Sequence, residues 1–228
     1  MNDSPQQSFT KKVWNYLFVN KANMWIAIFT CVLTLFTGLL AYIAHETDET
    51  NKVSQRAFIS YQGTGGSKIL TQDGSAIASV QVLVLWQNGG NTPTRTAFTR
   101  VNWQPFFPDL PDNFAFHDIG DAETRPFVVG PKASSTIAIV VPISAFSDAK
   151  ERKNRLFMWG WTTYRDSFKK SPPRLTEFCS EIVNIGSTKP SLTDPTGELT
   201  WQATTCKTHN CYDEDCEDYQ SKTSQKPN

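Results

Sequence analysis

The stretch VQVLVLWQNGGNTPTRTAFTRVNW (Val80–Trp103) carries the pattern that decides the fold. Two runs of β-branched and aromatic residues flank a polar segment, Gln87–Arg95, and such runs predict two strands. Gly89 and Gly90 can adopt the positive φ that a tight reversal needs. We therefore expect Gln87–Arg95 to form the exposed turn of a β-hairpin, or a corner, rather than a ligand loop.

Similar runs recur from Gln55 to Cys206, and no long helical pattern interrupts them. They predict a mainly β domain, an antiparallel immunoglobulin-like β-sandwich of seven or eight strands. The glycine-rich GTGGSK (Gly63–Lys68) is expected to be a loop, and one or two helical turns are expected after Ser144. The proline-rich run Pro105–Pro126 is expected to cross irregularly between the sheets. The expected strands lie within 56–63, 76–86, 96–106, 125–131, 134–143, 155–166, 174–185 and 198–206.

Aromatic residues alternate in RLFMWGWTTYRD (Arg155–Asp166). Phe157, Trp159 and Trp161 fall on one face of a strand, because successive side chains of a strand point to opposite faces. A face of this kind is more typical of a core than of an exposed stacking platform. We therefore expect these three rings to be buried.

An apolar run, MWIAIFTCVLTLFTGLLAYIA (Met24–Ala44), has 21 residues without a formal charge. At roughly 1.5 Å per residue, a helix of this length crosses the roughly 30 Å hydrocarbon core of a bilayer. Trp25 and Tyr42 lie near its ends, where aromatic rings favour the headgroup region. The run is longer than the apolar core of a signal peptide, and its end, AYIA, has Tyr42 where a cleavage site needs a small residue. We therefore expect an uncleaved transmembrane helix that contacts the lipid bilayer.

Lys11, Lys12 and Lys21 precede this run, and acidic residues follow it before Lys52 and Arg56. Because basic residues near a span stay in the cytoplasm, the N-terminus is expected inside and the C-terminal domain outside. The N-terminal segment is either a helix lying on the membrane surface or an extension of the anchor helix. The predicted organisation is a cytoplasmic segment (1–23), a transmembrane helix (24–44), a polar stalk (45–54), a β-sandwich (55–206) and an acidic, partly disordered tail (207–228).

The sequence contains, in this order, LWQNGGNTPTR (Leu85–Arg95), YRDSF (Tyr164–Phe168), FC (Phe178–Cys179) and the tail HNCYDEDC (His209–Cys216). These segments resemble those of a group of bacterial membrane proteins. In that group, an N-terminal anchor precedes a β domain with W-x-N-x-G-N-T-P, Y-x-D-x-F and F-C segments in this order. The resemblance implies a single-pass protein with an immunoglobulin-like domain, and it implies no activity. The spacer KKSPPRLTE departs from the shorter version in the group.

The charges and motifs argue against several classes of function. The 22 basic and 22 acidic residues cancel, so no general field favours nucleic acid. His45, His117 and His209 are scattered, and the sequence contains no G-x-S-x-G, C-x-x-C, phosphate-loop or H-E-x-x-H motif. We therefore expect no enzymatic activity, no cofactor and no resident metal.

The C-terminal tail concentrates cysteines among acidic residues. In an oxidising compartment, Cys179, Cys206, Cys211 and Cys216 are candidates for one or two disulfides. A zinc site on the last three with His209 is an alternative, although the spacing matches no known finger. A calcium site on the acidic residues lacks the usual loop order, and a solvated tail with free thiols is the remaining alternative.

The leading hypothesis is a non-enzymatic protein of the bacterial inner membrane whose β domain lies in the periplasm and binds a protein partner. One alternative places the β domain in the cytoplasm as a sensor or scaffold, and another is a hydrolase or metal-dependent enzyme. The residues expected to contact the partner are Asn88, Asn91 and Arg95 on one loop, with Tyr164 and Asp166 near another.

Overall fold

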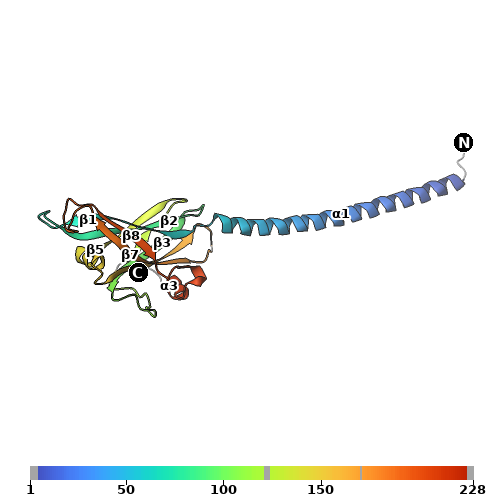
Figure 1. Ribbon diagram of the computed structural model, residues 1–228. Coiled ribbons are helices and arrows are strands. Elements are labelled where there is room, and N and C mark those ends of the chain that lie inside the picture. The colour runs from blue at the N-terminus through green and yellow to red at the C-terminus, as the bar shows by residue number, and fades with distance from the viewer. Residues whose placement is uncertain (1–4, 121–123, 170, 225–228) are drawn as a thin grey trace. The chain divides into compact units, whose positions relative to one another are not determined.

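The computed structural model describes residues 5–120, 124–169 and 171–224. The chain is mainly β, with antiparallel sheets and one long N-terminal helix (Figure 1). It divides into two compact units, residues 1–53 and 54–228. The predicted class, mainly antiparallel β after one long apolar helix, is confirmed.

Helix α1 (Pro5–Gln55) contains the apolar segment 24–44, whose side chains are exposed. Among the described residues, it is the one helix long and apolar enough to cross a membrane. Thr30, Thr34 and Thr37 donate their hydroxyls to carbonyl oxygens four residues earlier, at 2.8 Å, so these groups are satisfied within the helix. Helical backbone also covers residues 5–23 and the segment 45–54 that was expected to be a stalk; residues 1–4 lie outside the described residues.

Two antiparallel sheets form the second unit, the β domain. Their strands are β1 (Ile59–Leu70), β2 (Ile77–Asn88), β3 (Thr94–Phe106), β4 (Arg125–Phe127), β5 (Ser134–Pro142), β6 (Arg155–Asp166), β7 (Arg174–Ser187), β8 (Leu199–Thr205) and β9 (Cys211–Tyr212). One sheet has the order β1-β2-β5 and the other β4-β3-β6-β7-β8, with β9 paired to β7. The short helices are α2 (Ile143–Lys150), where one or two turns were expected, η1 (Asp213–Asp215) and α3 (Tyr219–Ser224).

The two sheets share an apolar core. Trp86 of β2 packs with Tyr164 of β6 and Phe178 of β7, and the Phe178 ring stacks on Tyr61 of β1 at 4.2 Å. Farther along the same strands, Val80 and Val82 meet β6, β7 and the buried Phe146 of α2. Because alternate residues of a strand share a face, each of these strands sends every second side chain into this core.

Ile59, the first residue of β1, lies opposite Asn88 of β2 and is hydrogen-bonded to the other sheet. Strand β1 pairs with β2, and the Ile59 amide also donates to Tyr164 Oη at 3.2 Å. The Thr176 hydroxyl of β7 donates to the Ile59 carbonyl at 2.7 Å. All three residues are buried, where hydrogen bonds are electrostatically stronger than in water. The start of β1 is therefore fixed by side chains of the second sheet as well as by its own ladder.

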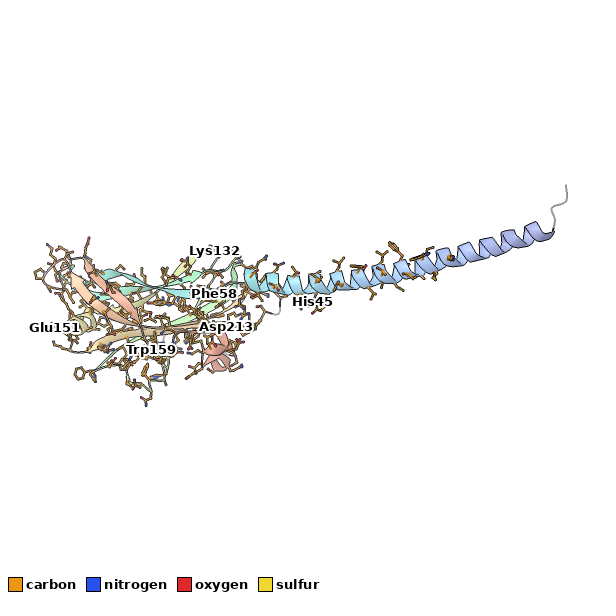
Figure 2. The ribbon with its side chains drawn as sticks, turned by 45° about the vertical axis from the view of Figure 1, so that its right-hand side comes forward. His45, Phe58, Lys132, Glu151, Trp159 and Asp213 are labelled. Atoms are coloured by element: carbon orange, nitrogen blue, oxygen red, sulfur yellow. A yellow bond between two sulfur atoms is a disulfide. The ribbon has the colours of Figure 1, made fainter. Side chains whose placement is uncertain are left out.

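The second sheet is also covered on its outer face. Phe157, Trp159 and Trp161 are at most 4 % exposed, as predicted. They lie under the loop that follows β3 and under the C-terminal segment. The indole nitrogens of Trp159 and Trp161 donate to the His117 carbonyl (3.2 Å) and the Asp118 carboxylate (3.1 Å). Figure 2 shows where Trp159 lies in the β domain.

The prediction for Pro105–Pro126 was wrong in one respect. This run joins β3 to β4 of the same sheet, so it does not cross between the sheets. Its apolar side chains, among them Phe114 and Phe116, pack on Trp159 instead. Residues 107–120 of the run are irregular because they cover a sheet face rather than adding a strand to it.

The opening segment forms a corner, not a hairpin. Strands β2 and β3 belong to different sheets and do not pair, so Gln87–Arg95 carries the chain from one sheet to the other. Gly89 and Gly90 do not have the positive φ that we expected. Gly90 is required for a different reason: a Cβ atom there would overlap the Arg56 carbonyl oxygen and lie 2.8 Å from the Phe58 amide nitrogen.

The glycine-rich GTGGSK segment is part of β1 and not a loop, which corrects the sequence prediction. The strand has a bulge between Tyr61 and Gly63, and Gly63 has a φ of 133° that glycine readily adopts. Gly66 admits the indole of Trp201 from β8, because a Cβ atom would overlap that ring. Gly63 therefore serves the bulge and Gly66 serves close packing.

We predict that Gly90→Ala destabilises the β domain, whereas Gly65→Ala has little effect. The added methyl group at position 90 meets backbone atoms that cannot move away, with an expected loss of about 1–3 kcal/mol in the free energy of unfolding. At position 65 a Cβ atom meets nothing within 4 Å. Urea unfolding of the full-length protein in detergent, followed by tryptophan fluorescence, measures the difference. Equal midpoints for the two variants would contradict the close-approach explanation.

Candidate functional site

Asn88, expected to contact a partner, is fully buried and organises the corner. Its side-chain oxygen accepts hydrogen bonds from two backbone amides, and its side-chain nitrogen donates to backbone carbonyls. These partners are the Phe58 amide (3.0 Å), the Gly90 amide (2.9 Å), the Thr92 carbonyl (2.7 Å) and the Gly130 carbonyl (3.1 Å). The polar character of this segment therefore reflects backbone satisfaction and not exposure at this position.

Tyr164 and Asp166 are buried as well. The Tyr164 hydroxyl accepts the Ile59 amide, and burial raises the pKa of this hydroxyl to about 12. The Asp166 carboxylate accepts the Phe168 amide (3.0 Å) and the Ser171 hydroxyl (2.8 Å) in the turn after β6. The expectation that Asn88, Tyr164 and Asp166 face a partner is therefore corrected. Asn91 and Arg95 remain exposed.

The four candidate cysteines are paired. Cys179 of β7 is bonded to Cys206, which follows β8, and Cys211 is bonded to Cys216 across η1. Cys31, in the apolar helix, is a free thiol. The alternative zinc set of Cys206, His209, Cys211 and Cys216 has all its sulfur atoms in disulfides in this structure.

A buried carboxylate lies at the centre of the C-terminal segment. Glu177 projects from β7, and its side chain is only 3 % exposed. Its Oε1 lies 2.6 Å from Nζ of Lys222 in α3, and its Oε2 lies 3.2 Å from both His209 Nδ1 and Cys211 Sγ. We call Glu177, His209, Lys222 and the Cys211–Cys216 disulfide the Glu177 cluster. Figure 1 shows α3, which supplies the lysine, beside β7.

Burial governs the electrostatics of the Glu177 cluster. Loss of solvation raises the pKa of Glu177, and the bond to Lys222 opposes that rise. Burial and the nearby Lys222 lower the pKa of His209 to about 4, so its imidazole is neutral at neutral pH. The Nδ1 atom then carries the proton that faces Glu177, and Nε2 keeps a buried lone pair with no hydrogen-bond partner among the described residues. The ring lies flat on Phe116, with centroids 4.2 Å apart.

A pocket of about 520 Å³ lies beside this cluster and is lined by Glu177, His209 and Cys211. Its other polar lining residues are mostly acidic: Asp112, Asp215, Glu217 and Asp218, with Lys207, Thr208 and Asn210. A second pocket, of about 500 Å³, is lined by Phe107, Lys150 and Arg155. Figure 2 shows Phe58 and Asp213 near one end of the β domain and Glu151 at the other. The first pocket combines three kinds of group. A carboxylate and a neutral imidazole can bind cations or transfer protons, and a disulfide can react with thiols.

Glu177 and Lys222 were not expected from the sequence to form a site. One signal for Glu177 was present, because RLTEFCSEIV (Arg174–Val183) places a carboxylate inside an apolar strand, two residues before a cysteine. Nothing in the sequence marks Lys222, whose partner lies 45 residues away. His209 was considered only as one member of a zinc set.

We predict that Tyr164→Phe lowers the free energy of unfolding by about 1–3 kcal/mol, because the buried Ile59 amide loses its acceptor. Tyr212→Phe, at an exposed position, is the matched control and is expected to change it by less than about 0.5 kcal/mol.

The ionisation of Tyr164 also makes the stability of the β domain depend on pH in the alkaline range. Because folding raises the pKa of Tyr164 to about 12, the unfolded chain loses this proton first, and stability falls as pH rises from about 10 towards 12. The Phe variant is expected to lose less stability between pH 9 and 11 than the parent. Urea unfolding at several pH values measures both effects, and parallel losses in parent and variant would contradict the assignment.

No protein-family model and no curated protein matches this chain. Among solved structures, the crystal structure of a protein from Archaeoglobus fulgidus matches with 9 % sequence identity and a TM-score of 0.23. The match covers 65 % of this chain and 99 % of that one. A TM-score this low carries no argument about the fold or the function of the chain.

Proposed function

We propose that this chain is a single-pass protein of the bacterial inner membrane whose β domain acts outside the cytoplasm as a protein-binding module without enzymatic activity. Residues 24–44 would form the anchor, with the N-terminus in the cytoplasm. The observation that carries the proposal is the pair of disulfides, both in the β domain. Disulfides persist in oxidising compartments such as the periplasm and are rare in the cytosol.

The anchor is supported by the apolar side chains of 24–44, which are exposed along α1. In water, exposure of this apolar surface would be unfavourable, whereas in a bilayer the same side chains contact the lipid acyl chains. The unpaired Cys31 fits this assignment, because it lies in the same segment and would be in lipid.

An immunoglobulin-like architecture is supported by the strand order. In such domains, strands A, B and E share one sheet, and strands C, F and G share the other. With β1 taken as strand A, the order β1-β2-β5 corresponds to A-B-E, and β4-β3-β6-β7 corresponds to C′-C-F-G. Strands β8 and β9 extend the second sheet past strand G. Domains of this architecture present their end loops to partners on a rigid scaffold.

The proposed partner surface is the corner surface, defined as Asn91, Arg95, Val128 and Lys132. Asn91 and Arg95 are exposed polar residues of the corner, and Val128 is 65 % exposed. Lys132 bonds to the Gly89 carbonyl, which places it at the same corner. The corner backbone is held by Asn88, so these side chains project from a rigid support. An exposed apolar residue beside two cations favours a partner with an apolar contact and acidic groups.

We expect alkaline phosphatase fused after Asn228 to be active in cells and a fluorescent protein at the same position to be dark. Fusions after Asn23, before the anchor, are the matched control and should give the reverse. Alkylation of the native protein without reductant should modify Cys31 alone. A fluorescent C-terminal fusion would contradict the proposed side of the membrane.

We also expect a photo-crosslinking amino acid at Arg95 to give a defined protein adduct in cells. The same amino acid at Glu151, at the opposite end of the β domain, is the control and should give none. Adducts of equal yield at both positions, or none at Arg95, would contradict the assignment of the corner surface.

A further inference from the structure

The Glu177 cluster brings together the atoms that a zinc site uses. One carboxylate oxygen of Glu177 and the sulfur atoms of Cys211 and Cys216 all lie within 4.8 Å of one another. His209 Nδ1 lies 3.2 Å from Glu177 Oε2, the same oxygen that contacts Cys211. The two cysteines are separated by four residues, which is within the spacing of paired zinc ligands. Thiolate, imidazole and carboxylate are the groups that bind zinc in proteins.

In this structure the two sulfur atoms are bonded to each other. We propose that reduction of the Cys211–Cys216 disulfide converts the Glu177 cluster into a zinc site, with Cys211, Cys216, His209 and Glu177 as the four ligands. The oxidised and reduced chains therefore differ in whether this segment is closed by a sulfur–sulfur bond or by a metal ion.

The electrons and protons of this conversion balance when a dithiol is the reductant. The dithiol gives two electrons and two protons and becomes a disulfide itself, while the Cys211–Cys216 bond breaks to give two thiols. As Zn²⁺ binds, the two thiols release two protons to water and two sulfur–zinc bonds form. His209 binds through the lone pair of Nδ1, and its proton then resides on Nε2.

Lys222 makes the local charge compatible with both states. In the oxidised chain, the carboxylate of Glu177 (−1) and the ammonium of Lys222 (+1) sum to zero. In the zinc form, Zn²⁺ (+2), two thiolates (−2), Glu177 (−1) and Lys222 (+1) also sum to zero. A buried site with no net charge avoids the cost of an uncompensated ion. A lysine beside a ligand carboxylate is therefore no obstacle to the metal.

The local backbone holds the ligands in place without the disulfide. Glu177 is fixed on β7, and β9 pairs with β7 at Glu177 and Cys211. The Cys216 amide donates to the Asp213 carbonyl at 3.0 Å, which keeps η1 closed. The adjacent pocket gives solvent access to the wall formed by Glu177, His209 and Cys211. The other disulfide has different surroundings, because Cys179 and Cys206 pack with Phe157 and Trp159 and do not line this pocket.

The experiment uses the full-length Cys31→Ser chain in detergent, reduced with a phosphine that is then removed without oxygen. Titration with Co²⁺ is expected to give a thiolate-to-cobalt charge-transfer absorption that saturates at one ion per chain and disappears when Zn²⁺ is added. The oxidised chain is expected to give none. The absence of this absorption in the reduced chain would overturn the proposal.

Two matched variants separate the disulfides. Reduced Cys179→Ser/Cys206→Ser protein is expected to keep the cobalt signal, and Cys211→Ser/Cys216→Ser protein is expected to lose it. The opposite result, or a signal in both, would overturn the site. Metal binding itself drives folding of zinc segments, so the signal does not require a rigid reduced state.

Glu177→Gln removes an anionic ligand and should weaken Co²⁺ binding about tenfold or more. Unchanged affinity would overturn the assignment of Glu177.

Discussion

Strand β6 is apolar on both faces, and the burial of its second face determines how the rest of the β domain is arranged. Leu156 and Met158 face the core shared by the two sheets, whereas Phe157 and Trp159 face outward from it. Burying an aromatic side chain contributes about 1.5–3 kcal/mol, so leaving this outer face in water would be costly. The chain meets that requirement with the loop after β3 and with the segment after β8. Both become layers of the domain instead of solvated extensions.

Burial of that face has an electrostatic consequence, because the covering segment encloses polar groups with the apolar ones. Glu177 projects from β7 under this layer, and a carboxylate in such surroundings requires a partner. Lys222 supplies the charge, and its ammonium also lies 5.9 Å from the centre of the Trp161 ring. The disulfide Cys179–Cys206 attaches the start of the covering segment to β7, and restricting the unfolded chain in this way is worth about 3 kcal/mol. Apolar packing, charge pairing and covalent bonds therefore act on the same short segment.

The sequence was sufficient for those elements whose pattern is local. Alternation and β-branching marked the long strands except the glycine-rich second half of β1, and an unbroken apolar run marked the long helix. Which strands pair with each other could not be predicted from neighbouring residues. Nothing in Gln87–Arg95 distinguishes a hairpin from a corner, because both need the same turn residues. The role of Gly90 depends on Arg56, and the burial of Asn88 depends on backbone groups from three segments. Glu177 and Lys222 could not be paired, since their contact exists only after α3 packs on β7. Reading a polar loop as an exposed loop was the error behind the misplaced partner residues.

The doubly bonded start of β1 has a mechanical meaning. Residues 56–58 join α1 to β1, so tension transmitted along the chain from α1 reaches β1 just after the bond between the Phe58 amide and Asn88. There the pull is resisted by the β2 ladder and by the hydroxyls of Tyr164 and Thr176 in the other sheet. Several hydrogen bonds at this point would have to break before β1 could be pulled out of the domain. A domain tethered to a moving surface would thus resist being unravelled from its attached end.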